Sequence, residues 1–269
     1  MKKLSARRRH PLAALVVLLL ALAATGGLYA ALAPQKAVAD DTQQSLAIEE
    51  GKKLFAVGCS SCHGMSGQGS KADGPSLVGV GSAAVDFQVG TGRMPAQQPG
   101  AQVPQKKVAY TQAEIDQLAA YIASLGPGPS TPSKEQTATT DASVARGGEL
   151  FRTNCASCHN YQGKGGALTN GKYAPDLTGV SAKHMYEAML TGPQNMPSFP
   201  DSTLTEDNKR DIIAYLQEVN SDDSVSPGGF SLGSLGPVTE GLFGWIFGLG
   251  ALIFVAIWVA AHTTKAKKS

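Results

Sequence analysis

Apolar residues are concentrated in two long runs, one near each end of the chain. The first run extends from Pro11 to Pro34 and the second from about Leu242 to Ala261, and neither contains a charged residue. Each run is close to the roughly 20 residues that a helix needs to cross a bilayer. The pattern therefore predicts an apolar helix at each end, with a region of mixed polarity between them.

In the region between these runs, one hydrophobic pattern occurs twice. Each half has an opening helix, a stretch rich in Gly and Pro that predicts loops, and a closing helix with apolar residues at helical spacing. The opening helices are predicted to begin near Ser45 and Asp141, which are suitable N-cap residues. The closing helices are predicted to begin after Thr111, in a capping box with Glu114, and after Thr205.

Six landmarks recur in the same order in both halves, which indicates a duplicated domain. They are Gly51 and Gly147, Phe55 and Phe151, two Cys-x-x-Cys-His runs, Pro75-x-Leu77-x-Gly79 and Pro175-x-Leu177-x-Gly179, Met94-Pro95 and Met196-Pro197, and Tyr121 and Tyr215. We therefore expect a mainly α protein. Its expected parts are a basic N-terminus with an apolar membrane or signal segment (1–36), domain 1 (45–125), a linker (126–140), domain 2 (141–220), a second linker (221–237), a transmembrane helix (238–262) and a lysine tail (263–269).

All four cysteines belong to the two Cys-x-x-Cys-His runs, which have the spacing that attaches a c-type haem. Such thiols form thioethers with the haem, and the adjacent histidine binds the iron. The runs predict two covalently bound haem c groups, held by Cys59, Cys62, Cys155 and Cys158. A zinc cage of four thiolates is an alternative, but it leaves both histidines without a role. A thiol redox pair would need a βαβ context, which the sequence lacks.

Each iron is predicted to have a histidine ligand, His63 or His159, and a methionine on its opposite face. Met94 and Met196 are the candidates, because both precede a proline at the same place in the repeat. Methionine and histidine together form an electron carrier with a raised reduction potential. His184 competes with Met196 for the second iron, although the first half has no counterpart of His184.

The other methionines and the proline carbonyls also receive predicted roles. A ligating histidine usually donates its second ring N–H to a carbonyl, and Pro75 and Pro175 are placed to accept it. Met65 follows the first histidine too closely to reach the far face of a haem, so we interpret it as a packing residue. Met185 and Met189 are four residues apart and are expected in a helical core.

Charge is divided between the ends of the chain and its middle. Nine basic residues lie within 1–36 and 263–269, whereas residues 37–240 hold 14 basic and 21 acidic residues, a net charge of −7. Lys and Arg collect on the cytoplasmic side of a membrane, so both termini are predicted to be cytoplasmic and the haem domains extracytoplasmic, at the cell membrane. The acidic middle has no basic, aromatic-bearing face for nucleic acid, which excludes that partner.

The two apolar runs differ in how clearly they indicate a membrane span. The first has a basic leader and an Ala37-Val38-Ala39 sequence, so it can be a cleaved signal peptide or a retained helix, and its length favours retention. The second has Trp245 near one end, Trp258 near the other and lysines beyond, which is typical of an anchored span.

With these residues in view, each half resembles the class I c-type cytochromes. The match covers residues 45–125 and 141–220 and includes the haem motif, Pro-x-Leu-x-Gly, Met-Pro and the closing Tyr helix. In that family a glycine of the opening helix permits a close crossing with an aromatic residue of the closing helix. The pairs that this implies here are Gly51 and Phe55 with Tyr121, and Gly147 and Phe151 with Tyr215.

The layout of nearly the full chain is similar to the diheme cytochrome cc subunits of actinobacterial quinol–cytochrome c reductases. The resemblance implies an electron-transfer subunit of a translocase complex, with no catalytic chemistry of its own beyond haem redox. It implies cytochrome b and a Rieske iron–sulfur protein as partner subunits. It also implies electron delivery to the copper centre of a terminal oxidase.

Two other functions are compatible with the haem motifs. The chain can be the cytochrome subunit of a periplasmic dehydrogenase or of another oxidase, although the C-terminal anchor argues mildly against this. A diheme peroxidase is the third hypothesis, and it would need one iron with an open site. Two well-placed Met-Pro motifs speak against it.

Overall fold

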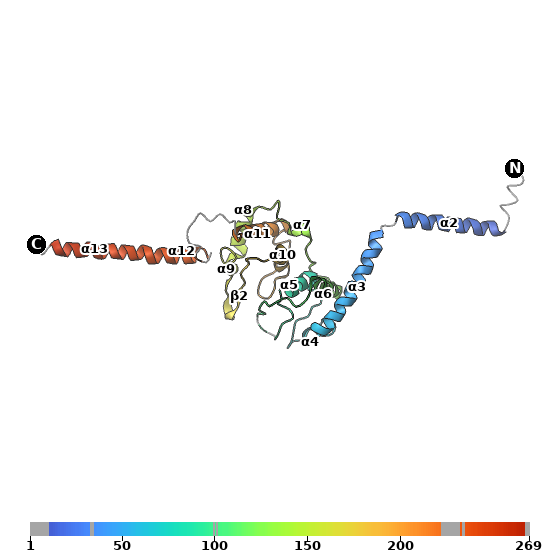
Figure 1. Cartoon of the computed structure of the whole chain (residues 1–269), viewed down its shortest axis with the longest axis horizontal. Coiled ribbons are helices and arrows are strands. Elements are labelled where there is room, and N and C mark those ends of the chain that lie inside the picture. Colours follow the sequence, from blue (N-terminus) through green and yellow to red (C-terminus); the bar gives the residue numbers. More distant parts are fainter. Residues whose placement is uncertain are drawn as a thin grey trace.

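The computed structural model describes residues 11–32, 35–98, 100, 102–221, 232 and 235–266. The described chain is mostly helical, which confirms the predicted fold class, and two helical domains lie between an apolar helix at each end (Figure 1). The predictions for residues 1–10, for most of 221–237 and for 267–269 lie outside the described residues.

In chain order the elements are α2 (Pro11–Leu32), α3 (Gln35–Gly58), α4 (Ser60–His63), α5 (Gly81–Gly90), α6 (Gln112–Ser124), α7 (Lys134–Thr137), α8 (Val144–Asn154), α9 (Ala156–His159), β1 (Gly166–Ala167), the 3₁₀ turn η1 (Thr169–Gly171), β2 (Tyr173–Ala174), α10 (Ala182–Thr191), α11 (Glu206–Val219), α12 (Pro237–Gly244), the π-helical turn η3 (Trp245–Leu249) and α13 (Gly250–Ala266).

The first domain is built on the crossing of α3 and α6. Gly51 lies at this crossing, where a Cβ would overlap the backbone carbonyl of Gln117 on α6. One turn later Phe55 packs on Tyr121, with ring centroids 5.3 Å apart, and both rings are buried. Because only glycine permits so close an approach, the predicted pairing of Gly51 and Phe55 with Tyr121 is confirmed.

The second domain repeats this crossing with α8 and α11. A Cβ on Gly147 would overlap the backbone carbonyl of Asp211, and Phe151 packs on Tyr215 with ring centroids 5.5 Å apart. The two crossings match, since Gly and Phe hold the same positions before each haem motif and each Phe packs on the Tyr of its closing helix. The predicted second set of pairs is therefore confirmed, and the internal repeat is a repeat in three dimensions.

A third helix completes each core, α5 in the first domain and α10 in the second. Val85 and Val89 of α5 are buried against α6, and Met185 and Met189 hold the corresponding places in the second core. The prediction that these two methionines are core residues is confirmed. The prediction for Met65 is wrong: its side chain is 69% exposed, because it lies on the surface turn that follows α4.

Both closing helices begin at the predicted residue, but neither opening helix does. Thr111 forms a full capping box with Glu114, and Thr205 accepts a hydrogen bond from Asn208 N–H. Ser45 is not an N-cap: α3 already begins at Gln35, and the Ser45 hydroxyl donates to the carbonyl of Asp41 at 2.8 Å. No glycine or proline between 35 and 50 interrupts that helix.

In the second copy the N-cap lies two residues later than the predicted Asp141. Ser143 caps α8, and its hydroxyl accepts from Arg146 N–H. The Ser143 N–H in turn donates to the Asp211 carboxylate at 2.6 Å. A contact from α11 therefore fixes where α8 begins, and this contact is not visible in the local sequence.

The segment from 126 to 140 is fixed to both domains along its length. In its first half, Ala83 N–H donates to the Pro129 carbonyl at 3.1 Å and Thr131 N–H donates to Ser82 Oγ at 2.9 Å. In its second half, which contains α7, the carbonyl of Ala138 accepts from Arg210 Nε at 2.7 Å. The linker predicted for these residues is therefore an ordered strap that joins the two domains.

The domains contact each other through equivalent helices and through one loop. Helix α5 of the first domain packs against α10 of the second. The loop after Met94 also reaches across: the Gln102 amide exchanges two hydrogen bonds with the Tyr173 backbone, at 2.7 and 2.9 Å. The Gln194 amide does the same with the Val103 backbone, at 3.0 and 3.2 Å.

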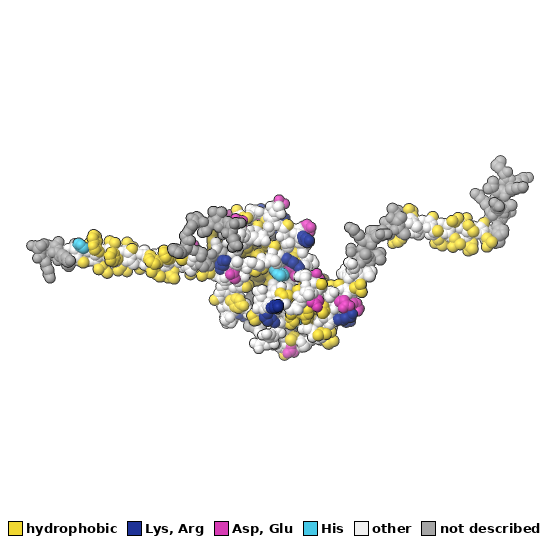
Figure 2. All heavy atoms as spheres, viewed as in Figure 1, with side chains coloured by type: hydrophobic (Ala, Val, Ile, Leu, Met, Phe, Trp, Pro, Cys, Tyr) yellow, Lys and Arg dark blue, Asp and Glu magenta, His cyan; other side chains and the backbone are white. Residues whose placement is uncertain are grey.

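Two helices in the described chain are long and apolar enough to cross a membrane. They cover Leu12–Tyr29 and Pro237–His262, each with a mean hydropathy of 2.3, and neither is buried against the rest of the protein. Figure 2 shows their apolar side chains exposed along both extensions, outside the domains. This agrees with the predicted apolar helices at the two ends.

Candidate haem sites

The first Cys-x-x-Cys-His run lies where α3 ends and the short helix α4 begins. His63 N–H donates to the Cys59 carbonyl at 3.0 Å, which closes the turn and brings the motif's ends together. The His63 ring is buried, and its Nδ1 lies 2.8 Å from the Pro75 carbonyl oxygen. A carbonyl only accepts, so Nδ1 carries the proton and Nε2 keeps the lone pair that a metal ion requires.

The second run has the same geometry at α9. His159 N–H donates to the Cys155 carbonyl at 2.9 Å, and His159 Nδ1 lies 3.2 Å from the Pro175 carbonyl oxygen. Burial lowers the pKa of His159, and the bond to Pro175 opposes that shift only in part. The ring is therefore held neutral with Nε2 free. Both predicted proline acceptors are confirmed.

The thiols of the two motifs are free in both domains. Burial, reinforced by the neighbouring cysteine of each motif, raises the pKa of Cys59 and of Cys155 to about 11. Neutral, partly buried thiols suit thioether bonds to an apolar macrocycle better than they suit thiolate chemistry. The four thiols also do not form the alternative zinc site. Within the described residues the one group of His, Cys, Asp or Glu with converging ligand atoms contains no cysteine.

Met94 is partly buried against the core of the first domain, in the loop after α5. Its N–H donates to the Gln88 carbonyl at 2.9 Å. Gly92, with φ +71°, allows the chain to turn there, and a Cβ on it would overlap the Lys106 carbonyl. Lys106 N–H donates to the Gly92 carbonyl at 3.2 Å, and the Lys106 ammonium to the Pro95 carbonyl. The loop that carries Met94 is thus fixed on both sides.

Met196 holds the corresponding place in the second domain, partly buried against the core. Its N–H donates to the Pro193 carbonyl at 3.1 Å, after Gly192 ends α10 in a left-handed conformation with φ 60°. Phe199 N–H then donates to the Met189 carbonyl at 2.6 Å, which returns the loop to the core. The structure therefore places both methionines in matching loops.

His184 belongs to a different environment. It lies on α10 and faces the first domain, with its Nε2 3.7 Å from Asp86 Oδ1 and its ring edge-on to Phe87. This contact between domains accounts for the presence of a histidine that the first half does not repeat.

The residues present in each domain fit haem c. Each domain offers two thiols at the start of and within one short helix, a buried imidazole whose Nδ1 faces a proline carbonyl, and a methionine on a constrained loop. This donor set is complete in both copies without borrowing from the other. The fold and the sites define a c-type cytochrome with two cytochrome c domains.

Comparison with known families supports this class. Residues 48–126 match the family described as Cytochrome c. Residues 142–216 match the family described as Cytochrome C oxidase, cbb3-type, subunit III. Each match covers one of the two domains.

Similar proteins extend over nearly the whole chain. A protein of Mycobacterium tuberculosis (strain H37Rv) named cytochrome bc1 complex cytochrome c subunit is 47% identical over 264 residues, covering 96% of this chain and 93% of its own length. A protein of the same name from Corynebacterium efficiens is 46% identical over 280 residues, covering 97% and 94%. The cbb3-type cytochrome c oxidase subunit FixP of Sinorhizobium medicae is 29% identical over 139 residues, covering 49% and 45%.

This chain belongs to the family of cytochrome bc1 complex cytochrome c subunits. It is an electron-transfer protein with covalently bound haem c and a subunit of a redox enzyme complex, so it has partner subunits.

Proposed function

We propose that the chain is a membrane-anchored diheme relay that carries electrons from a Rieske iron–sulfur protein to a terminal oxidase, beside cytochrome b. The observation that carries this proposal is the presence of a complete donor set in each domain, with no thiol left for other chemistry. Full-length similarity to bc1 complex subunits supports the identity of the partners. In this reading the chain belongs to a quinol-oxidising translocase complex.

The ligand roles follow from the two matching sites. Cys59 and Cys62 would attach one haem, and His63 and Met94 would ligate its iron. When bound, haem c supplies one-electron redox chemistry at its iron. The chain's contribution is to fix the imidazole tautomer through the Pro75 carbonyl and to hold the methionine on a loop tied by Lys106.

The second domain repeats these roles with its own residues. Cys155 and Cys158 would attach the haem, and His159 and Met196 would ligate its iron. A soft, neutral thioether raises the reduction potential in both domains. With both a histidine and a methionine as ligands, neither iron would keep an open position for peroxide.

The two apolar helices anchor the domains to the cell membrane. Lysines and arginines outside each run, at the extreme ends of the sequence, support cytoplasmic termini and extracytoplasmic haem domains. The net charge of −7 over residues 37–240 suits a partner with a basic docking face. Trypsin added to intact cells should spare the C-terminal lysines, whereas trypsin added to inverted vesicles should remove them. Removal of these lysines in intact cells would contradict the proposed topology and place the C-terminus outside the cell.

Purification of the intact chain from membranes tests the relay directly. We expect cytochrome b, the Rieske protein and a copper-containing oxidase to copurify, and quinol to reduce the haems of the chain. Removal of the Rieske protein should abolish that reduction while reduction by dithionite remains. Quinol reduction that persists without the Rieske protein would refute the proposed electron donor.

A second candidate has one observation in its favour. The second domain matches subunit III of cbb3-type oxidases, so the chain can instead be a subunit of an oxidase alone. That function predicts copurification with an oxidase when cytochrome b is absent from the preparation. Loss of the chain from the membrane with loss of cytochrome b would favour the relay in a bc1 complex.

A further inference from the structure

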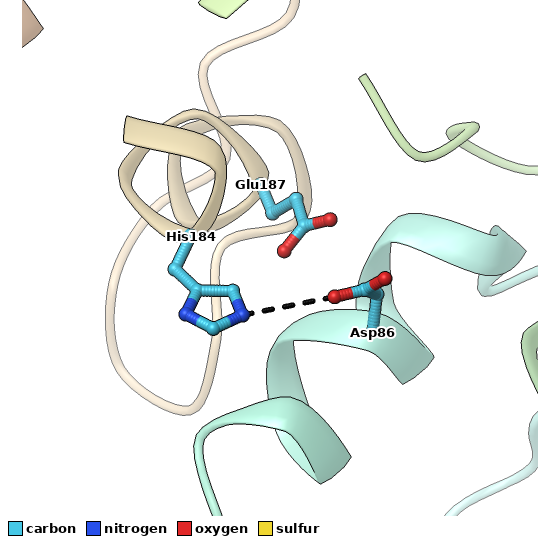
Figure 3. Close-up of side chains that lie close together, drawn as sticks. All are labelled: Asp86, His184 and Glu187. Carbon is cyan, nitrogen blue, oxygen red and sulfur yellow. Dashed lines mark ion pairs between the residues drawn. The ribbon is translucent and has the colours of Figure 1, made fainter. Parts of the chain in front are cut away.

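A buried polar cluster lies where the two domains meet. Asp86 comes from α5 of the first domain, and His184 and Glu187 come from α10 of the second. Asp86 is 1% exposed and Glu187 is 0% exposed. Figure 3 shows the two carboxylates and the imidazole converging on one point between the helices. This arrangement is separate from both haem motifs and uses none of their ligands.

Three buried oxygen atoms of the cluster have no hydrogen-bond partner. They are Oδ1 of Asp86 and both carboxylate oxygens of Glu187. The His184 Nε2 lies 3.7 Å from Asp86 Oδ1, and one ligand atom from each of the three residues lies within 4.8 Å of the others. Buried carboxylate oxygens without a partner are costly, so a positively charged or donating group is required at this point.

The surrounding side chains supply only part of that charge. The Lys183 ammonium bonds to Oδ2 of Asp86, and Gln112 Nε2 lies 3.5 Å from the same oxygen, so neither occupies Oδ1. Burial, then the Asp86 charge, raises the pKa of Glu187 to about 8, and Lys183 opposes this. Burial would raise the pKa of Asp86 too, but the nearby His184 imidazole and the Lys183 ammonium hold it below the usual value.

The donor set has the composition of a divalent transition-metal site. One imidazole nitrogen and two carboxylate oxygens are ligands that zinc accepts. Two ligand atoms about 2.1 Å from a tetrahedral zinc ion are roughly 3.4 Å apart, close to the observed His184–Asp86 separation. His184 and Glu187 stand at i and i+3 on α10, so they project from the same face of that helix.

We propose that Asp86, His184 and Glu187 form a binding site for a divalent metal ion of the zinc class, which joins the two haem domains. A water molecule or hydroxide completes the coordination. Lys183 remains on the outer oxygen of Asp86 and orients that carboxylate toward the ion. Because the ligands come from both domains, the ion fixes α5 against α10 and so holds the domains in one arrangement.

The test uses the full-length, haem-loaded chain in detergent. The chain is stripped with a chelator and titrated with Zn²⁺ alone, with calorimetry for affinity and X-ray absorption at the zinc edge for the ligands. We expect about one ion per chain, bound by imidazole nitrogen and oxygen. His184→Gln should lower the affinity roughly tenfold or more and remove the imidazole signal.

Glu187→Gln should lower the affinity to a similar extent, whereas Lys52→Gln, at an exposed lysine of α3 outside the cluster, is the control and should still bind. Haem spectra show whether each variant is folded. Hydrogen exchange supplies a second readout: zinc should slow exchange in both 81–90 and 182–191 of the parent and leave His184→Gln unchanged. Equal zinc binding by parent and His184→Gln, or no binding by the folded parent, would overturn the proposed site. The remaining explanation of the cluster would then be a proton shared between the Asp86 and Glu187 carboxylates.

Discussion

The two cytochrome domains agree closely at their haem motifs and helix crossings and differ in helix length, loop length and buried charge. In both, a glycine and a phenylalanine of the opening helix meet a tyrosine of the closing helix, and the motif histidine bonds to a proline carbonyl. Outside this frame the opening helix is 24 residues long in the first copy and 11 in the second. The segment between Met-Pro and the N-cap of the closing helix is also longer in the first copy, where it covers residues 96–110, than in the second, where it covers 198–204.

Buried charge provides a second difference. In the second domain the side chain of Lys209 is 0% exposed and bonds to Asp201 and to the Leu204 carbonyl, and Asp211 is buried beneath Ser143 and Arg146. Gln117 stands at the place of Asp211 in the first domain. In the second domain, contacts with the Asp211 carboxylate therefore fix the start of the short opening helix, whereas the opening helix of the first domain already begins at Gln35.

The comparison separates two kinds of residue. Features present in both copies hold the haem, because each copy needs them independently. Some features present in one copy connect the domains to each other, namely Gln102, His184 and the strap of 126–140. The duplication thus acts as an internal control, and each prediction below changes one copy and leaves the other as the reference.

The largest effect is expected from the thiols. Replacing both Cys59 and Cys62 by alanine should remove one haem and leave the other, because each domain attaches its own. The haem-to-protein ratio, measured on the purified chain, should fall to about half, and the pair Cys155→Ala and Cys158→Ala should do the same. Ser61→Ala, within the same motif, should change nothing. Loss of both haems from a single pair would show that the sites are not independent.

Exchange of the axial methionine should give the next largest effect. Met94→His should keep the haem attached but lower one of the two reduction potentials, because nitrogen favours ferric iron more than a thioether does. The expected shift is on the order of 0.1 V, within the roughly 0.8 V that axial ligands span. Redox titration measures it, and Met196→His should move the other potential.

Met65→His is the matched control for this exchange, since Met65 is exposed and lies in the same domain. It should leave both potentials in place. An unchanged potential in Met94→His would show that the ligand of the first iron is misassigned.

A methyl group at the helix crossing should destabilise both domains equally. Gly51→Ala and Gly147→Ala each force a Cβ into a backbone carbonyl, at a cost of about 3 kcal/mol, offset by about 1 kcal/mol of improved helix propensity. We expect a net loss of about 2 kcal/mol in unfolding free energy, measured by denaturant titration. Lys52→Ala and Glu149→Ala, exposed neighbours on the same helices, should cost little. A large effect in one copy alone would mean that the crossings are not equivalent.

The smallest effect concerns acid stability of the two closing helices. Bonds to the Thr111 N–H and hydroxyl lower the pKa of Glu114, so its contribution is present above its unfolded pKa and is lost as the pH falls through its folded pKa. The second copy has Asn208 at that position. Acid should therefore speed hydrogen exchange in 112–124 of the parent relative to Glu114→Gln, and should have no such effect in 206–219. Identical exchange in parent and variant at every pH would refute the difference.

The sequence predicted what the two copies share, because repeated landmarks select the positions that both domains need. The proline acceptors could be predicted from their position after each motif, and the helix crossings from the resemblance to class I c-type cytochromes. Ser45 and Asp141 failed as helix starts because the real limits depend on an uninterrupted helical sequence and on a contact from Asp211. The prediction that Met65 is a packing residue was wrong because its distance from His63 along the chain does not determine whether its side chain is buried.

The residues that join the domains could not be predicted. Asp86 and Glu187 are 101 positions apart, and neither has a counterpart that would make it stand out in the repeat. The His-x-x-Glu spacing of α10 was the one available signal. It indicates that His184 and Glu187 lie on the same helix face, but it does not indicate which residue faces them. Gln102 and Gln194 carry no signal, because their amides pair with backbone groups of the opposite domain.

The central claim is that each domain covalently holds its own haem c, and intact-mass spectrometry of the denatured, purified chain tests it most directly. The account predicts the mass of the polypeptide, less any cleaved leader, plus two haem groups. Tryptic peptides that contain Cys59–His63 and Cys155–His159 should each carry one of them. A chain that is colourless, or whose mass contains one haem or none, would contradict the claim.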